Sequence, residues 1–507
     1  MASIMTGRYA HQTGMLGLMH TAHKWQFDFT CPLLPEYFRN AGYYTALYGI
    51  QKISLYVKKT GYLEIQDGAF TADQLSGAAG NFFSKYKEDK PFFLFLGFNE
   101  PHRINGNVPS AECFGYAPDS SRGIFVPGYI PQRNPAEKKT AQKEFASLQG
   151  AVKAFDYAVG GVLSQLEKAN HQRRTIVMLF SDLGIAMPGA KGTLYDAGTG
   201  IPLIIRLPAC NTDQKKYDNR LISSIDIFPS LCGLASLPAP ENISGINFAG
   251  KANGYFRNEL FMEKNFHDNY DPIRAIRTSR YKYIVNFECQ RRINLSVDIL
   301  KSAVFTRSPE YYLGERPQLE LYHLENDSLE QKNLAGQADI SIMNELRTKL
   351  LTWMQETKDP LLSGPIKSNY YQEAVNSLEK NTGHCNFFFP GIPENKREEI
   401  LRYDQILSGI LSFIDSNYPD KITMRSICRR YDLEYTSFSR YFKKITGFHF
   451  NDYLNQVRVH YASLLLKNTC KSVLEIALAC GFSSPGYFAG IYKKIKGRHP
   501  RQDKNKI

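Results

Sequence analysis

An internal repeat near the C-terminus constrains the fold more than any other feature of the 507-residue sequence. The segment 438–447 (FSRYFKKITG) recurs fifty positions later as 488–497 (FAGIYKKIKG), with the aromatic residues, the Lys-Lys pair and the final glycine in register. A short segment with helical apolar spacing precedes each copy, Met424–Tyr431 in the first and Val473–Cys480 in the second. Each unit therefore predicts a short helix, a tight turn and a second helix that ends at a glycine. The turn of the second unit requires a positive φ, which Gly481 can adopt.

Basic charge is concentrated in the same region. The formal net charge of the chain is +13, and residues 396 to the end carry about 20 Lys and Arg against about 10 Asp and Glu. The preceding residues are therefore nearly neutral. A basic segment attached to a neutral body favours a polyanion as the partner of that segment, and a pair of helices of this kind is the helix-turn-helix arrangement that enters the DNA major groove. A basic face that is merely solvated is the alternative.

The first 250 residues alternate apolar runs with helix-like stretches, which is typical of an α/β sheet. Continuous apolar runs indicate strands covered on both faces, as in largely parallel sheets, and they lie at 92–98, 176–180 and 202–206. The segment Phe145–Ala169 predicts an amphipathic helix whose apolar stripe is Leu148, Val152, Phe155, Val159, Leu163 and Leu166. The segment Arg274–Phe287 predicts a strand or hairpin of a smaller second sheet, and residues 361–395 predict a linker.

Targeting and redox signals are weak. No apolar run approaches about 18 residues, so no membrane-spanning helix and no membrane partner are expected. The first residues (MASIMTGR) lack the basic start and apolar stretch of a secretory signal, so we expect a cytoplasmic location. The nine cysteines show no paired spacing and are expected to be free thiols.

The C-terminal segment resembles the AraC/XylS-type transcription regulators over about residues 400–500. The resemblance is carried by ITMRSICRRYDLEYTSFSRYFKKITGFHFNDYLNQVRVHYASLLL in the first unit and by SVLEIALACGFSSPGYFAGIYKKIKGRHP in the second. It implies an all-α double helix-turn-helix DNA-binding domain at 396–507 with seven helices. A long linker helix around Phe450–Leu466 would set the distance between two recognition helices, which would enter successive major-groove segments of double-stranded DNA.

Candidate DNA contacts follow from this arrangement: Thr436, Ser437, Ser439, Arg440, Lys443 and Lys444 in the first unit, and Ser484, Tyr487, Lys493 and Lys494 in the second. Arg440 is the candidate for a guanine edge, with a contact to a phosphate or a carboxylate as the alternative. The aromatic residues of the first recognition helix are expected to belong to the core. Gly486 and Gly490 each cost the second recognition helix about 1 kcal/mol relative to alanine and remove side chains that would read bases. The second unit is therefore expected to hold mainly phosphate.

The N-terminal segment resembles the sulfatase family over residues 1–360. Seven separated motifs appear in order: SIMTGRYAHQTG from Ser3, LPEYFRNAGYYTAL from Leu34, PHR from Pro101, SD from Ser181 with KGTLY from Lys191, IDIFP from Ile225, DPIRAIRT from Asp271 and LYHLEND from Leu321. The resemblance implies an alkaline-phosphatase-like α/β fold with a small C-terminal sheet from about residue 250. The chain would thus be multidomain, an incomplete α/β sulfatase fold followed by the all-α domain.

The residues that the sulfatase reaction requires are largely missing from this sequence. The resemblance implies a formylglycine nucleophile in a C-x-P-x-R motif and a calcium ion, and it places that motif immediately before Ala2, so we expect a truncated domain. The Gly-Lys-x-His signature of the family aligns on residues 49–52 (GIQK), and the metal-binding Asp-His or Asp-Asn pair aligns on Asp182-Leu183. His102 and Lys191 survive as remnants of catalytic residues and Asp182 as a remnant metal ligand. A lone carboxylate is a poor calcium site, so no cofactor is expected unless the site is completed. Lys191 is expected to be solvated at the surface, His102 to be an ordinary histidine, and the strand at 176–180 to lie at a sheet edge.

Three hypotheses for function remain open at this stage. The first is a sequence-specific transcription regulator with a degenerate, inactive sulfatase-like domain, which has double-stranded DNA and RNA polymerase as partners and a sulfated sugar as a speculative ligand. The second is a sulfuric ester hydrolase with an appended DNA-binding module. The third is a decayed fusion in which neither half is fully functional.

Overall fold

Two units make up the chain in the computed structural model, residues 1–19 with 25–366 and residues 367–507 with 20–24. The structure describes residues 1–19, 25, 27–30, 32–54, 56–87, 89–104, 113–208, 217–249, 256–267, 270–287, 295–313, 316–337, 340–366, 406–407, 410–411, 413–414, 417–446, 448–468 and 471–504. Most of the predicted linker at 361–395 lies outside these residues.

A parallel sheet of three strands forms the first layer of the N-terminal unit. Its strands are β1 (Tyr44–Gly49), β2 (Glu64–Asp67) and β3 (Phe92–Gly97), in the order β2-β1-β3. The helix α3 (Ala72–Lys85) packs on this sheet through Leu75, Ala79 and Phe82, and the side chain of Thr71 caps its first turn. The prediction of a parallel strand at 92–98 is confirmed.

The second pair of strands corrects the sequence prediction of a largely parallel sheet. β4 (Val177–Phe180) and β5 (Leu203–Arg206) pair antiparallel, and the side chain of Ile204 is 62% exposed. The prediction that residues 202–206 form a strand covered on both faces is therefore wrong. A short apolar run does not determine the direction in which the chain re-enters a sheet. In the described part of the chain β4 pairs with β5 alone, so it is an edge strand, as predicted.

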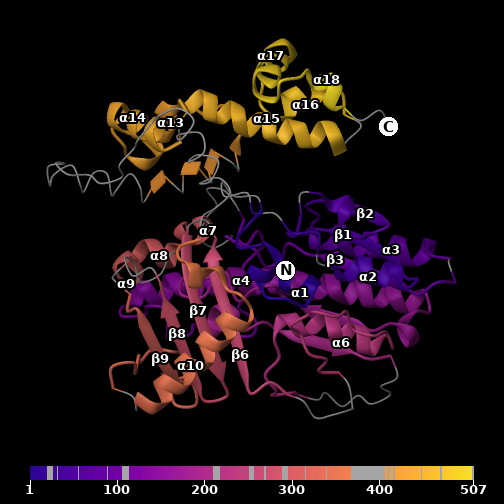
Figure 1. Cartoon of the computed structure of the whole chain (residues 1–507), viewed down its shortest axis with the longest axis vertical. Helices are drawn as coiled ribbons and strands as arrows, with labels where there is room; N and C mark the ends of the chain where they lie inside the picture. The colour runs from indigo at the N-terminus through magenta and orange to yellow at the C-terminus, as the bar shows by residue number, and fades with distance from the viewer. Residues whose placement is uncertain are drawn as a thin grey trace. The chain divides into compact units, whose positions relative to one another are not determined.

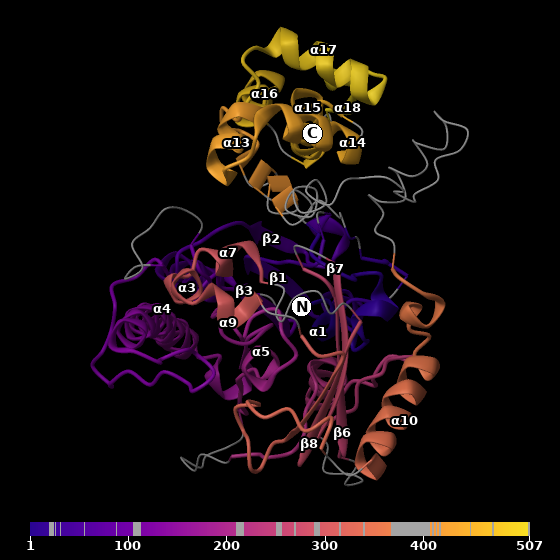
Figure 2. The same cartoon turned by 90° about the vertical axis from the view of Figure 1, so that its left-hand side faces the viewer.

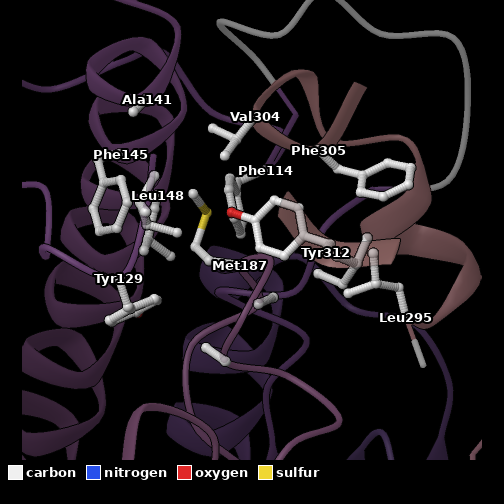
Figure 3. Close-up of a cluster of buried hydrophobic side chains, with 14 of the residues drawn as sticks. Phe114, Tyr129, Ala141, Phe145, Leu148, Met187, Leu295, Val304, Phe305 and Tyr312 are labelled. Carbon is white, nitrogen blue, oxygen red and sulfur yellow. The ribbon is translucent and has the colours of Figure 1, made fainter. Parts of the chain in front are cut away.

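The long helix α4 (Pro135–Lys168) crosses the N-terminal unit and carries its largest apolar core. Asn134 caps its start by accepting hydrogen bonds from Ala136 N and Glu137 N, so the helix begins ten residues earlier than predicted. Its inward face presents Phe145 and Leu148 to Met187 of a neighbouring loop and to Tyr312 (Figure 3). Val152, which the predicted stripe placed in the core, is 45% exposed. The neighbouring Ala151 is buried instead, so the apolar stripe is displaced by one residue there.

A second, antiparallel sheet follows in the sequence. It contains β6 (Glu259–Phe266), β7 (Tyr270–Thr278), β8 (Tyr281–Asn286) and β9 (Leu319–His323), in the order β6-β7-β8-β9. β7 and β8 form the hairpin predicted at Arg274–Phe287. The helix α10 (Ile340–Glu356) covers one face of this sheet, with the Trp353 ring stacked 5.1 Å from the Phe261 ring (Figure 2). Shorter elements complete the unit: α1 (Ala2–Thr6), η1 (Ala10–Thr13), α2 (Leu34–Asn40), η2 (Val57–Lys59), η4 (Gln172–Arg174), α5 (Asp196–Thr199), η5 (Ser224–Asp226), α6 (Ile227–Leu234), α7 (Val297–Leu300), α8 (Ala303–Arg307), α9 (Pro309–Leu313) and η6 (Pro360–Ser363).

The C-terminal unit is helical throughout its described residues. Its elements are α13 (Met424–Tyr431), α14 (Tyr435–Thr446), α15 (Phe450–Asn468), α16 (Val473–Ala479), α17 (Pro485–Lys496) and α18 (Pro500–Asp503), and the described residues among 406–417 are helical as well. The long helix α15 runs between the pair α13–α14 and the group α16–α18 (Figure 1). The boundaries predicted for α13 are confirmed, and those for α16 differ by one residue. Gly481 has a φ of +78°, as predicted for the turn of the second unit.

Two further predictions concern the whole chain. No helix within the described ranges is both long and apolar enough to cross a membrane. Cys113, Cys232, Cys428 and Cys480 are free, as predicted, and the other five cysteines lie outside the described residues.

Candidate functional site

The helix α14 is anchored by aromatic side chains on one face. Phe438 and Phe442 are fully buried and Tyr441 nearly so, in a core shared with α13 and α15, which confirms that they belong to the core. Glu434 precedes the helix and its carboxylate accepts hydrogen bonds from Thr436 N at 2.9 Å and Ser437 N at 2.5 Å. These backbone donors lower the pKa of Glu434 to about 2. The Glu434 carboxylate therefore caps the first turn of α14 and stabilises the start of this helix.

The opposite face of α14 carries the predicted DNA contacts. Thr436, Arg440 and Lys443 are exposed, and Ser437 and Ser439 are partly exposed. Their spacing places them together on the face opposite the aromatic core. No ion pair ties Arg440 to a carboxylate within the described residues, so its guanidinium is available to an external acceptor. The side chain of Lys444 lies outside the described residues.

The helix α17 differs from α14 at its first turn. The hydroxyl of Ser484 accepts a hydrogen bond from Tyr487 N at 3.2 Å and thereby caps the helix, while the Tyr487 hydroxyl accepts one from Asn455 Nδ2 at 3.2 Å. Lys493 and Lys494 are exposed near the other end. At Gly486 and Gly490 an added Cβ would meet no heavy atom within 4 Å. Two of the four predicted contacts on this helix therefore already have local hydrogen-bonding partners.

Two side chains of α15 tie this helix to the segment before α13. Arg458 donates from Nε to Tyr418 O at 2.7 Å and from Nη2 to Asp420 O at 2.9 Å. The ring of Tyr461, also on α15, stacks on Tyr418 at 4.3 Å between centroids. Partial burial lowers the pKa of Arg458. These contacts join the segment before α13 to the helix that carries the second unit.

Three side chains from distant segments meet in the N-terminal unit, and we refer to His102, Lys191 and Asp298 as the His102 cluster. Lys191 Nζ donates to Asp298 Oδ2 at 2.7 Å and lies 3.3 Å from His102 Nε2. His102 Nδ1 lies 2.7 Å from Arg103 O, and Ser296 Oγ donates to Asp298 Oδ1 at 2.6 Å. Because Nδ1 faces a carbonyl oxygen, the neutral imidazole carries its proton there and Nε2 accepts from the Lys191 ammonium.

Charge and burial act together on the His102 cluster. Burial, with Lys191 and Lys52 next, lowers the pKa of His102, so the neutral ring is favoured. Burial alone would raise the pKa of Asp298, but the Lys191 ammonium outweighs it and holds that pKa well below its usual range. Burial and Lys191 lower the pKa of Lys52, while Asp182 and Asp298 oppose this. Lys52 therefore lies within electrostatic range of Lys191 and Asp298.

The His102 cluster shows that the expected exposure of Lys191 is wrong, and it includes Asp298, which the sequence analysis did not name. Lys191 was expected to be solvated, yet it is only 4% exposed, because Asp298 compensates its charge inside the fold. Asp298 lies in none of the sequence motifs and could not be identified from them, whereas Lys52 is the residue that aligns with the histidine of the family signature at 49–52. His102 and Lys191 are brought together, whereas Asp182 is an exposed residue within electrostatic range of Lys52.

A calcium ion does not fit the residues present. Within the described part of the chain, no group of three or more His, Cys, Asp and Glu side chains is placed to hold a metal. Asp182 is followed by Leu183, which offers no side-chain ligand, and Lys52 and Lys191 would repel a cation. Gln51 is engaged by its own loop: its Oε1 accepts a hydrogen bond from Ile53 N at 2.9 Å, and its Nε2 donates to Ser54 O at 2.8 Å.

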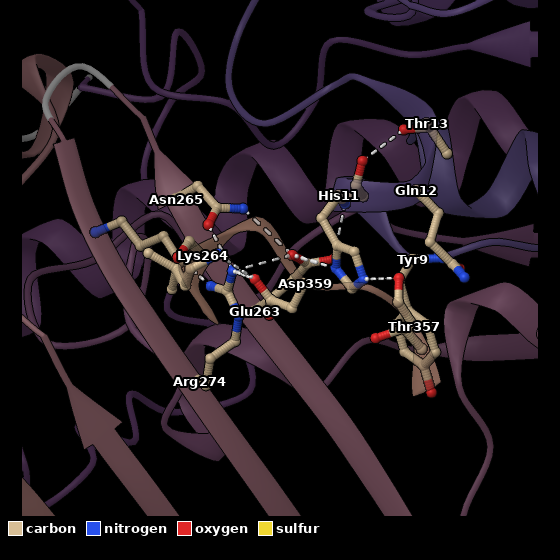
Figure 4. Close-up of polar contacts among 12 residues, drawn as sticks. Tyr9, His11, Gln12, Thr13, Glu263, Lys264, Asn265, Arg274, Thr357 and Asp359 are labelled. Carbon is tan, nitrogen blue, oxygen red and sulfur yellow. Dashed lines mark hydrogen bonds and ion pairs between the residues drawn. The ribbon is translucent and has the colours of Figure 1, made fainter. Parts of the chain in front are cut away.

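A separate polar network surrounds His11 and serves packing. His11 Nδ1 lies 3.0 Å from Glu263 Oε2 and its Nε2 lies 3.2 Å from Thr357 O (Figure 4). The fully buried Arg274 donates to Asp359 Oδ1 and Oδ2 at 2.8 and 2.5 Å. The network links the N-terminal segment, the second sheet and the end of α10, so it stabilises the fold of this unit.

Comparison with known families assigns both units. A family model described as "Sulfatase" matches residues 1–237, and one described as "N-sulphoglucosamine sulphohydrolase, C-terminal" matches residues 190–299. A model described as "Helix-turn-helix domain" matches residues 427–506. The chain joins a sulfatase domain to an AraC-type helix-turn-helix domain. The His102 cluster lies in the sulfatase domain, and α14 and α17 lie in the helix-turn-helix domain.

Relatives and solved structures agree with the assignment of the sulfatase domain. The N-sulphoglucosamine sulphohydrolase of Homo sapiens is 25% identical over 418 residues, which cover 72% of this chain and 82% of that protein. An ulvan-active sulfatase of Formosa agariphila is 25% identical over 290 residues, 54% of this chain and 47% of that protein, so the match spans about half of its length. The structure of a 2-O GAG sulfatase has a TM-score of 0.52 at 20% identity, covering 73% of this chain and 83% of that one. A Bacteroides fragilis protein assigned to the sulfatases has a TM-score of 0.55 at 18% identity, covering 72% and 86%. At these identities the structures establish the alkaline-phosphatase-like fold.

Proposed function

We propose that this protein is a sequence-specific, DNA-binding transcription regulator whose sulfatase domain does not turn over sulfate esters. The observation that carries the proposal is the two-sided character of α14. Its aromatic face is buried, and Thr436, Arg440 and Lys443 are exposed on the other face. A recognition helix needs both a fixed orientation and free polar side chains at the DNA.

Side chains of the sulfatase domain support the proposed lack of sulfate-ester turnover. Lys191, which would otherwise be free to meet a sulfate group, is ion-paired with Asp298 at 2.7 Å. Lys52 stands where the family signature has a histidine, and Leu183 stands where a metal ligand is expected. A substrate sulfate would have to displace the Asp298 carboxylate from a buried pair, and the described residues offer no group of ligands for a calcium ion to assist it.

Location and partners complete the proposal. A regulator of this kind acts in the cytoplasm on double-stranded DNA and contacts RNA polymerase there. A sulfated sugar is the proposed effector of the sulfatase domain, with Lys52, which lies within electrostatic range of Lys191 and Asp298, as the cation that would meet its sulfate group. The printed names of the relatives, an N-sulphoglucosamine sulphohydrolase and an ulvan-active sulfatase, are compatible with such a ligand.

The test is a mobility-shift titration of the full chain against DNA upstream of its own coding sequence, over a series of salt concentrations. Arg440→Ala should weaken binding to the preferred sequence by about 1–3 kcal/mol if Arg440 reads a base, and Lys443→Ala should weaken binding to all sequences and reduce the salt slope by about one. Arg173→Ala, an exposed arginine of the sulfatase domain, is the matched control and should change nothing. Absence of DNA binding at low salt would overturn the proposal. An equal loss on all sequences for Arg440→Ala would reassign Arg440 to a phosphate.

The second candidate function is sulfate-ester hydrolysis with an appended DNA-binding domain. It is favoured by the 3.3 Å approach of Lys191 Nζ to His102 Nε2, since the two surviving remnant residues lie side by side. Incubation of the full chain with an aryl sulfate and calcium, with Lys191→Ala as the comparison, distinguishes the two. Release of sulfate by the wild-type chain and its loss in the variant would establish the hydrolase and refute the proposed inactivity.

A further inference from the structure

The sulfatase domain contains a cavity of about 350 Å³ that shares no residue with the His102 cluster. It lies among four segments: the loop before α4, the loop that leads into α5, the helix α9, and β9 with the turn that follows it. Its walls are the rings of Phe125, Tyr129, Tyr195, Tyr311 and Tyr322, and we refer to it as the Glu330 pocket. A volume of this size lies in the range of small-molecule sites.

A neutral cluster of charges forms the polar side of the Glu330 pocket. Asp196 and Glu330 line the cavity, and behind them the fully buried Lys282 places Nζ 2.5 Å from Asp196 Oδ1 and 2.8 Å from Glu330 Oε1. Arg277 Nη2 lies 3.1 Å from Asp196 Oδ2. The charges of these four residues cancel, and the buried carboxylate of Glu320 behind Tyr195 and Tyr322 adds a negative charge, so the pocket does not favour an anionic ligand. The carboxylates nevertheless retain lone pairs that can accept hydrogen bonds, and the side chain of Asp196 is partly exposed.

Five aromatic side chains form much of the lining of the Glu330 pocket. The hydroxyls of Tyr195 and Tyr322 both donate to Glu320 Oε2, at 2.7 and 2.5 Å, so these two rings are fixed. At the mouth, Phe125 is 79% exposed and Leu329 is 39% exposed. Exposed apolar side chains at the rim of a concave site mark a surface that gains free energy when a ligand covers it.

One residue that lines the pocket has a strained backbone conformation. Glu330 has a φ of +54°, in the left-handed region that a residue with a long side chain rarely adopts. Its carboxylate accepts a hydrogen bond from Asp196 N at 2.5 Å, so the strained turn holds this carboxylate over the start of α5. Such strain persists where surrounding contacts require one conformation and is frequent at ligand sites.

From this combination we infer that the Glu330 pocket is a binding site for an uncharged sugar ring. The C–H faces of a sugar ring pack on aromatic side chains, and its hydroxyls donate to carboxylates and exchange hydrogen bonds with Ser328 and Gln331, which also line the cavity. The balanced charge of Asp196, Glu330, Lys282 and Arg277 favours a neutral ring over a sulfated one. The site is thus distinct in both place and ligand from the cationic His102 cluster.

The test uses the full chain and three unsulfated sugars, D-galactose, N-acetyl-D-glucosamine and lactose, with saturation-transfer NMR and calorimetric titration as readouts. Saturable binding of at least one sugar is expected. Ser328→Trp fills the mouth and should weaken that binding at least tenfold, and Phe125→Ala should weaken it several-fold. Ser84→Trp, at an exposed serine of α3 outside the pocket, is the matched control and should bind as the wild type does.

Two further measurements make the result decisive. Because Phe125 is so exposed, Phe125→Ala should leave the fold intact even if Ser328→Trp does not, and in Phe125→Ala the fluorescence of Trp25 and Trp353 reports the fold of this domain. Inorganic sulfate should not displace the sugar. The inference is overturned if none of the three sugars binds saturably, if both pocket variants bind as the wild type does, or if sulfate competes.

Discussion

Exchange of single glycines for alanine tests the account of the second helix-turn-helix unit most directly, because two glycines in it should respond in opposite directions. Gly481 forms the turn between α16 and α17 with a φ of +78°, and a Cβ there would lie 2.3 Å from Pro419 O and 2.7 Å from Pro419 C. Both contact atoms belong to the backbone, so no side chain can rotate away.

The magnitude for Gly481→Ala has two contributions. The left-handed conformation costs an alanine about 1–2 kcal/mol, and forcing a methyl group into filled space costs about 1–3 kcal/mol more. The expected loss in the free energy of unfolding is therefore about 2–5 kcal/mol. Gly490, in the interior of α17, has an ordinary helical φ and open space around its Cβ position. Gly490→Ala should accordingly gain about 0.5–1 kcal/mol, because alanine loses less backbone entropy in a helix.

Hydrogen exchange followed by mass spectrometry on the full chain is the appropriate assay. Both tryptophans, Trp25 and Trp353, lie in the sulfatase domain, so intrinsic fluorescence does not report on α16 and α17. Backbone amides of α16 and α17 should exchange about 30-fold faster or more in Gly481→Ala and about two- to fivefold slower in Gly490→Ala. Equal exchange of Gly481→Ala and wild type would refute the reasoning from φ and close approach.

Three further predictions concern the His102 cluster and the cap of α17. Asp298→Asn should destabilise the sulfatase domain by about 3–5 kcal/mol because it leaves Lys191 buried without a carboxylate. Urea unfolding followed by tryptophan fluorescence measures this change. A loss in the free energy of unfolding under about 1 kcal/mol would contradict the buried ion pair. His102 has a lowered pKa in the folded state, so the unfolded chain binds the proton more readily and stability should fall as the pH drops below the ordinary value of 6.5. His102→Gln should reduce that fall between about pH 7.5 and pH 5.5, and an unchanged profile would argue against the lowered pKa. Ser484→Ala should destabilise α17 by about 1 kcal/mol and Ser484→Gly by only a few tenths, as amide exchange would show, if Ser484 acts as a cap; equal stability with weaker DNA binding in both would instead assign it to DNA.

The helix-turn-helix domain could be predicted almost completely because its signals are local. The repeat, the capping residues and Gly481 all act within a few residues of where they stand, so the boundaries of α13 follow from the sequence and those of α16 to within one residue. Less of the sulfatase domain could be predicted from the sequence. Its apolar runs located β3, β4 and β5, but the antiparallel direction of β5 depends on the path of the chain between strands.

The sequence by itself predicted two helix-turn-helix units, of which the second has Gly486 and Gly490 in its second helix, and it places Lys52 and Leu183 at positions where the sulfatase family has a histidine and a metal ligand. Only the tertiary structure decided that Lys191 is buried against Asp298, a residue 107 positions away. It alone assembled the Glu330 pocket from four segments. Local periodicity and capping record which residues are buried and where helices begin. The partners of a buried charge and the walls of a cavity arise only when distant segments are packed together, and no short-range pattern encodes them.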